Sequence, residues 1–123
     1  VVVAHKSRRG AQLAAQHLKS MGHFPIEIIG SKGSQFKDNG LFICTLSSLK
    51  GLTFDHVILI DLNAGQIPYM KRDDGIEDEE EARERRLLYM SMTRAKYSLL
   101  MSSVGKPSPF LYELDDRYCK MIQ

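Results

Sequence analysis

The stretch KGLTFDHVILID, at Lys50–Asp61, contains the clearest strand of the chain, and the fold prediction starts from it. Its second half, His56–Asp61, is an apolar, β-branched run of the kind found in strands buried on both faces of a parallel sheet. Four other runs are predicted to be strands: Val1–Ala4, Ile26–Ile29, Leu41–Cys44 and Tyr97–Val104.

Two segments between these runs have helical signatures. Apolar residues at helical spacing from Ala11 to Met21 predict a helix that ends at Gly22. The longest predicted helix is Glu77–Ala95, which is acidic in its first turns and basic at its end, as the helix dipole favours. Strands alternating with helices predict an α/β fold, a mostly parallel sheet with helices on both faces. Ligands of such sheets sit beyond the carboxyl ends of the strands, so these ends and both ends of the long helix are the candidate sites.

Three further segments are interpreted as connections. Ser31–Gly40 is predicted to be a polar loop, Lys71–Gly75 a charged spacer, and Pro107–Leu114 a segment that caps the domain.

Composition narrows the function classes. A chain of 123 residues is predicted to be a single domain, residues 1–123, and 17 Lys and Arg against 15 Asp and Glu give no domain-wide basic surface for nucleic acid. The two cysteines, Cys44 and Cys119, have no metal-ligand spacing, so we expect no metal site and a reducing, cytoplasmic setting. No apolar run is long enough to span a membrane, so no membrane partner is expected. The opening Val1-Val2-Val3, without an initiator Met, predicts a piece of a longer protein.

Most other polar residues are interpreted as structural. The four histidines, His5, His17, His23 and His56, are expected on the surface or in loops, and Asp61 is expected to cap a loop. The acidic cluster Asp73–Glu84 is expected to be a solvated helix face.

The chain has no phosphate-binding loop of its own. The pattern G-x-x-x-x-G-K-[ST] is absent, because Gly105-Lys106 is followed by Pro107, and G-x-G-x-x-G is absent too.

Thr45–Asp55, between two predicted strands, has two interpretations. The short hydroxyls of Thr45, Ser47 and Ser48 at a strand exit suit contacts to phosphate oxygens, and Lys50-Gly51 adds a cation and a permissive backbone. The other interpretation is a loop that caps its own backbone and leaves Lys50 in solvent.

Arg94 also has two interpretations. It ends a helical stripe that includes Leu87 and Met90, a stripe otherwise suited to the core. A buried guanidinium needs a partner, so Arg94 either pairs with a carboxylate or opens on a cleft that receives an anion.

Together these stretches resemble motifs of the UvrD/Rep-type superfamily 1 DNA helicases. KGLTFDHVILID resembles motif V (T-x-H-x-x-K-G-L-E-F-x-x-V), and ERRLLYMSMTRAK at Glu84–Lys96 resembles motif VI (E-R-R-L-x-Y-V-x-x-T-R-A). Val1–Gly30 resembles motif IV together with the segment after that motif, and Ser108–Leu114 resembles the segment that closes the domain.

The resemblance implies the second RecA-like domain of an ATP-dependent DNA helicase or translocase, the half without the phosphate loop. The N-terminal RecA-like domain of the parent chain would then bind most of the ATP and its Mg²⁺, and single-stranded DNA would be the other partner. By match to motif VI, Arg94 is the arginine finger that acts on the γ-phosphate. Motif V assigns Thr45, Ser47 and Ser48 to the DNA backbone, and assigns Lys50, Gly51 and Thr53 to the nucleotide.

Three positions depart from the family pattern. Thr53 stands where motif V commonly has a ribose-binding Glu, and Ser47 where it often has His. His5 stands where motif IV often has a second arginine near the γ-phosphate, with Lys6, Arg8 and Arg9 close by in sequence.

The resemblance favours a DNA-repair-type helicase whose isolated fragment is inactive, since half of the ATP site lies elsewhere. An alternative is an ATP-driven remodeller of a protein or transcription complex with little unwinding, which Ser47 in place of His would permit. A second alternative, an α/β interaction domain without a nucleotide role, fits the motif VI residues poorly.

Overall fold

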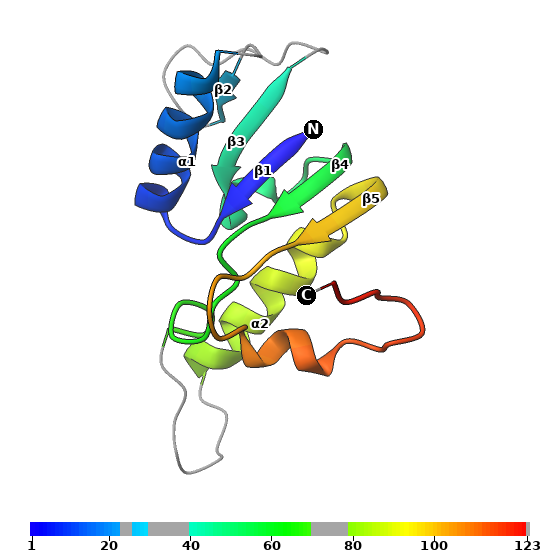
Figure 1. Ribbon diagram of the computed structural model, residues 1–123. Coiled ribbons are helices and arrows are strands. Elements are labelled where there is room, and N and C mark those ends of the chain that lie inside the picture. Colours follow the sequence, from blue (N-terminus) through cyan, green and yellow to red (C-terminus); the bar gives the residue numbers. More distant parts are fainter. Residues whose placement is uncertain (23–25, 30–39, 70–78, 123) are drawn as a thin grey trace.

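The chain forms one parallel sheet flanked by helices (Figure 1). The computed structural model describes residues 1–22, 26–29, 40–69 and 79–122. The elements, in chain order, are β1 (Val2–His5), α1 (Arg8–Met21), β2 (Ile26–Ile28), β3 (Leu41–Thr45), the 3₁₀-helix η1 (Leu46–Leu49), β4 (Phe54–Leu59), α2 (Glu79–Met92), β5 (Ala95–Met101) and the 3₁₀-helix η2 (Pro109–Glu113).

The strand order is β2-β3-β1-β4-β5, and every neighbouring pair is parallel. The first strand of the chain, β1, therefore lies at the centre, with all four of its residues buried. Its register places His5 beside Thr45 of β3 and Ala4 beside Leu59 of β4. The predicted α/β fold with a parallel sheet is confirmed.

Helices cover both faces of the sheet, because each face carries its own apolar cluster. On one face, Ala11 and Ala15 of α1 pack on Val3 and Ile43. On the other face, Leu88 of α2 joins a larger core that includes both fully buried leucines of η1. Phe110 of η2 closes that core, which is the capping role predicted for Pro107–Leu114.

Helix α1 begins three residues earlier than predicted, at Arg8. The reason is the cap: the Ser7 side chain accepts a hydrogen bond from the backbone N–H of Gly10. Gly22 ends the helix in the left-handed conformation with φ 70°, as its sequence position predicts.

Helix α2 ends earlier than predicted, at Met92. The backbone N–H groups of Thr93 and Arg94 bond the carbonyls of Met90 and Ser91, which tightens the last turn and releases the chain into β5 at Ala95. Arg94 and Lys96 therefore lie outside the helix. Strand β5 accordingly begins two residues before the predicted Tyr97 and ends at Met101, before Val104.

Strand β4 also begins earlier than predicted, at Phe54, because Phe54 pairs with Ala95 ahead of an irregularity between Phe54 and His56. Most of the predicted loop Ser31–Gly40, the spacer Lys71–Gly75 and the start predicted for the long helix at Glu77 lie outside the described residues.

The fold predicts different reactivity for the two thiols. Cys44 is 1% exposed in the core, and burial raises its pKa to about 12, so at pH 8 it is almost entirely the unreactive thiol. Cys119 is exposed.

An aromatic disulfide reagent should label one thiol per native chain, that of Cys119, and two thiols per chain in denaturant. Rapid labelling of both thiols in the native chain would contradict this packing.

Candidate functional site

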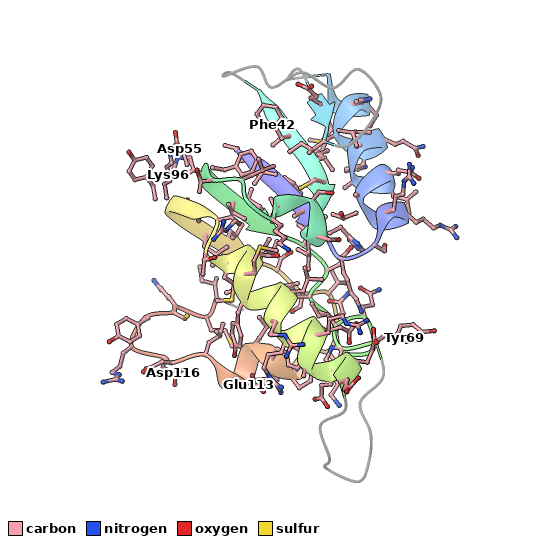
Figure 2. The ribbon with its side chains drawn as sticks, turned by 180° about the vertical axis from the view of Figure 1, so that it is seen from behind. Phe42, Asp55, Tyr69, Lys96, Glu113 and Asp116 are labelled. Atoms are coloured by element: carbon pink, nitrogen blue, oxygen red, sulfur yellow. The ribbon has the colours of Figure 1, made fainter. Side chains whose placement is uncertain are left out.

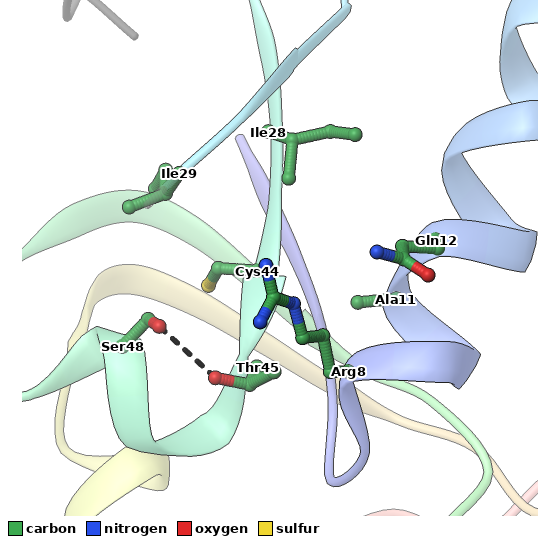
Figure 3. Close-up of a pocket in the computed structure, with 8 residues that line it drawn as sticks. All are labelled: Arg8, Ala11, Gln12, Ile28, Ile29, Cys44, Thr45 and Ser48. Carbon is green, nitrogen blue, oxygen red and sulfur yellow. Dashed lines mark hydrogen bonds between the residues drawn. The ribbon is translucent and has the colours of Figure 1, made fainter. Parts of the chain in front are cut away.

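A pocket opens at the carboxyl edge of the sheet, beside the end of β3 (Figure 3). Its volume is about 320 Å³. The first turns of α1, the end of β2, the end of β3 and the start of η1 line it with Arg8, Ala11, Gln12, Ile28, Ile29, Cys44, Thr45 and Ser48. Two of the predicted site residues, Thr45 and Ser48, are thus brought together in one cavity.

The pocket offers donors suited to an anion. In Figure 3 the Arg8 side chain extends into it, and no described acidic residue forms an ion pair with Arg8. Arg8 is also the first residue of a 14-residue helix with no acidic residue in its first turn, so the positive end of the helix dipole adds to its charge. The sequence pattern indicated Arg8 only as a neighbour of His5; its place at the capped start of α1 makes it a site candidate.

The hydroxyls at the strand exit divide into two groups. Thr45 Oγ1 and Ser48 Oγ are 3.0 Å apart and hydrogen-bonded to each other, and the Thr45 side chain makes no capping bond to the backbone of η1. Ser47 lies on the exposed side of η1, because Leu46 and Leu49 anchor its other side in the core. Lys50, which follows η1 and precedes Gly51, is exposed as well. Ser47 is therefore placed toward solvent at the same edge as the pocket.

His5 is buried, so the prediction of a surface or loop histidine is wrong at this position. Its Nδ1 accepts the backbone N–H of Ser7 at 2.9 Å, and its Nε2 lies 3.1 Å from Oδ2 of Asp61. Since Nδ1 accepts, the neutral ring carries its proton on Nε2 and donates it to Asp61. Both ring nitrogens are engaged within the chain, and Asp61 fixes the ring.

A third group at this edge centres on Lys6 and Glu84. Lys6 Nζ hydrogen-bonds the Glu84 carboxylate and the carbonyl of Gln66. The same carboxylate accepts the backbone N–H of Tyr69 at 3.0 Å. Tyr69 is 69% exposed, and its ring centroid lies 5.9 Å from Lys6 Nζ, so an aromatic side chain is accessible at the carboxyl edge. The sequence pattern did not indicate Tyr69, although its place in the turn after the clearest strand could have drawn attention to it.

The acidic cluster is not a solvated face throughout. Its residues 73–78 lie outside the described ranges, but Glu81 and Glu84 are only 7% and 6% exposed. Glu84 pairs with Lys6, and Glu81 lies 3.9 Å from Arg85. The predicted solvated face is wrong for these two, because cations from the β1 exit and from the helix itself neutralise them.

The remaining predicted residues lie at the opposite, amino edge. The backbone N–H of Phe54, the first residue of β4, donates to the carbonyl of Arg94 at 2.9 Å. Gly51 and Thr53 lie within the three residues before Phe54 and are both exposed, and Gly51 has φ 79°, which favours glycine. The structure thus groups Arg94, Gly51 and Thr53.

The Arg94 side chain is partly exposed and has only a neutral partner. Its Nε and Nη2 donate to Oγ1 of the adjacent Thr93, at 3.3 and 2.9 Å. No ion pair joins it to any acidic residue within the described ranges. Of the two interpretations, the local geometry therefore agrees with an arginine open to an external anion.

The two groups are far apart, at two of the positions expected for ligands: the carboxyl end of a strand for Thr45 and the end of the long helix for Arg94. The register places Thr45 level with Ile60, while Arg94 is bonded to Phe54, six residues earlier on β4. Six residues of strand span about 20 Å. Figure 2 shows the same separation: Asp55 and Lys96 lie at one end of α2, and Tyr69 and Glu113 near the other.

Metal-binding and membrane-spanning features are both absent from the described part of the chain. No group of three or more His, Cys, Asp and Glu side chains within these ranges is placed to hold a metal ion. No described helix has the length and apolar character that crossing a bilayer requires.

Comparisons with known proteins agree with this architecture. The sequence profile of the UvrD-like helicase C-terminal domain matches residues 26–106. A protein described as a probable DNA helicase II homolog, from Mycoplasma pneumoniae, is 37% identical over 74 residues, 60% of this chain. The ATP-dependent DNA helicase Rep from Buchnera aphidicola is 36% identical over 94 residues, 66% of this chain. The chain spans only 10% and 14% of the lengths of these relatives.

A solved structure has the same fold over nearly the whole chain. The C-terminal domain of a possible DNA helicase from Lactobacillus plantarum superposes with a TM-score of 0.69 at 26% identity, covering 94% of this chain and 63% of its own.

The packing around His5 predicts a large effect at Gly10. A Cβ added there would overlap the His5 ring, which hydrogen bonds hold in place, so Gly10→Ala should destabilise the chain by about 2 kcal/mol. An ordinary helical Gly→Ala change would instead stabilise by up to about 1 kcal/mol. Urea unfolding measures the difference, and a stabilised Gly10→Ala chain would refute the packing. Gly22→Ala is the control, since nothing lies within 4 Å and only its φ of 70° costs about 1 kcal/mol.

Proposed function

This chain belongs to the family of UvrD-like helicase C-terminal domains, and on that premise we propose that it is the second motor domain of an ATP-dependent DNA helicase or translocase. Its amino edge would complete an ATP site with the N-terminal RecA-like domain of the parent chain. Its carboxyl edge would hold single-stranded DNA. The cytoplasm and DNA repair are the setting we expect for such an enzyme.

The observation that carries the proposal is the state of Arg94. A guanidinium that is partly exposed, held in place by a neighbouring hydroxyl and unpaired with any described carboxylate can receive a phosphate. A planar cation fixed in advance stabilises the charge that develops on a transferred phosphoryl group, and it needs little rearrangement to do so.

The rest of the amino edge supports the same assignment. Gly51 lets the backbone approach a ligand closely, and Lys50 and Thr53 are exposed on either side of it. Thr53 offers a hydroxyl where the family commonly has a carboxylate, so it could still reach a ribose, with a weaker hydrogen bond. The phosphate loop and the Mg²⁺ ligands would come from the partner domain, so this chain alone should not hydrolyse ATP.

The carboxyl edge supports DNA binding through three kinds of group. Arg8 and the start of α1 supply positive charge, while Thr45, Ser47 and Ser48 supply short hydroxyls for backbone phosphates. The exposed ring of Tyr69 offers a face on which a base can stack. Because both ring nitrogens of His5 are engaged internally, we assign His5 to shaping this edge rather than to contacting the nucleotide.

Arg94→Ala tests the arginine finger in the full-length parent. Loss of the planar cation should reduce ATP turnover by about 10³-fold or more with nucleotide binding largely kept, because the interaction strengthens only as charge develops on the phosphoryl group. Steady-state turnover and fluorescent-nucleotide titration measure the two quantities. Arg83→Ala, on the exposed face of α2, is the control and should change neither. Unchanged turnover in Arg94→Ala, or parallel loss of binding and turnover, would refute the role.

Arg8→Ala tests the carboxyl edge in the same protein. Removing one phosphate contact should weaken single-stranded DNA binding about 3- to 10-fold and reduce the slope of log K against log salt by about 0.7. Arg9→Ala is matched in charge and helix turn but does not line the pocket, so it should change both quantities less. Equal effects of the two variants would contradict a specific pocket. An ATPase that single-stranded DNA does not stimulate would favour the protein remodeller instead.

A further inference from the structure

Lys6 and Glu84 join three segments that lie far apart in the sequence. Lys6 follows β1 directly, Glu84 lies in the second turn of α2, and the segment 63–69 supplies the carbonyl of Gln66 and the N–H of Tyr69. One cation and one carboxylate thereby fasten a turn, a loop and a helix to each other.

The ion pair between Lys6 and Glu84 is largely buried. The Lys6 side chain is 23% exposed and that of Glu84 8% exposed. Burial lowers the pKa of Lys6, and the charge of Glu80 opposes that shift. Because desolvation offsets much of the attraction, a buried ion pair is weak evidence of stabilisation by itself. Such a pair instead supplies a fixed geometry between the parts that it joins.

Each joined segment also carries a residue of the candidate site. The turn after Lys6 leads to Arg8 in the pocket, and the loop ends at the exposed ring of Tyr69. Helix α2 leads from Glu84 to Met92, and Arg94 follows two residues beyond its end. The eight residues from Glu84 to Met92 correspond to about 12 Å along a helix.

Packing and hydrogen bonds along helix α2 connect Glu84 to Arg94. Leu88 and Ser91 follow Glu84 on its buried face, and both are essentially inaccessible to solvent. At its end, the N–H of Arg94 bonds the carbonyl of Ser91, and the carbonyl of Arg94 bonds β4. A shift of the helix at Glu84 therefore changes the position of Arg94 relative to the sheet.

We propose that Lys6 and Glu84 are positioning residues through which DNA on the carboxyl edge sets the placement of Arg94 on the amino edge. DNA bound to Arg8 and Tyr69 would contact the segments on both sides of the Lys6–Glu84 ion pair. A resulting shift of Glu84 would then be passed along α2 to Arg94. This inference rests on the proposed function, since it needs both a DNA edge and an ATP edge.

The test is Lys6→Met in the full-length parent, with ATP turnover measured with and without saturating single-stranded DNA. Methionine keeps most of the side-chain length and removes the charge. We expect the stimulation by DNA to fall about 5- to 10-fold, within the range of coupling between two sites. Basal turnover should stay within about twofold, and the DNA affinity within about threefold, because Lys6 contacts neither ligand. Glu84→Gln, which keeps the shape and loses the charge, should behave in the same way.

Two controls separate coupling from simple structural support. Lys6→Arg restores a cation that can bond the Glu84 carboxylate and should recover most of the stimulation. Arg83→Met removes a cation from the same helix, one residue from Glu84, but from an exposed pair with Glu80, and should leave stimulation unchanged. Thermal melts of all variants establish that turnover is compared between folded proteins.

The outcomes are distinct. Unchanged stimulation in Lys6→Met, or equal loss of basal and stimulated turnover, would overturn the inference, as would unfolding of both Lys6→Met and Glu84→Gln. If the unmodified parent shows no stimulation by DNA, the proposed function itself fails. If the parent is stimulated and Arg94→Ala abolishes turnover, an unaffected Lys6→Met refutes this inference alone.

Discussion

Helix α2 is tied to the sheet near both of its ends, and the arrangement of the candidate site depends on these two ties. Near its start, Glu84 accepts hydrogen bonds from Lys6 and from the backbone of Tyr69. Beyond its end, the carbonyl of Arg94 accepts the N–H of Phe54. Because α2 runs from the carboxyl edge of the sheet to the amino edge, it spans the distance between the two groups of site residues. A rigid element of this kind can carry energetic coupling between two edges of a sheet.

The charged side chains of the domain differ in whether they have an ion-pair partner. Buried acidic groups such as Glu84 are paired with cations, as the cost of burying a bare charge requires. Arg85 is fixed in a similar way, because its guanidinium bonds both oxygens of Glu113 and lies over the Phe110 ring. Arg8 and Arg94 differ from these in having no described acidic partner, and each lies at an edge of the sheet. Cations left available at an edge are suited to ligands that bring their own negative charge.

Several features of the fold could be predicted because they are local. The β-branched run at His56–Asp61 indicates a buried strand whatever lies beside it, and Gly22 ends α1 because only a glycine readily takes its φ. Element ends were less predictable, since long-range bonds set them. Phe54 belongs to β4 only because Ala95, forty-one residues later, pairs with it. Likewise, His5, predicted to be a surface histidine, is buried because it ends the central strand β1, where Asp61, two residues beyond β4, bonds its ring.

The class of fold, the family and the residue types available for chemistry follow from the amino-acid order alone, because strand patterns and the motif spacing at Lys50–Thr53 and Glu84–Arg94 are properties of neighbouring residues. That order could not say that Thr45 and Arg94 face opposite edges, nor that Lys6 and Glu84 meet. These points depend on how distant segments pack against each other. A link of eight residues carries the chain from the end of β3 back to the start of β4, and only the parallel register shows that this link crosses the whole height of the sheet.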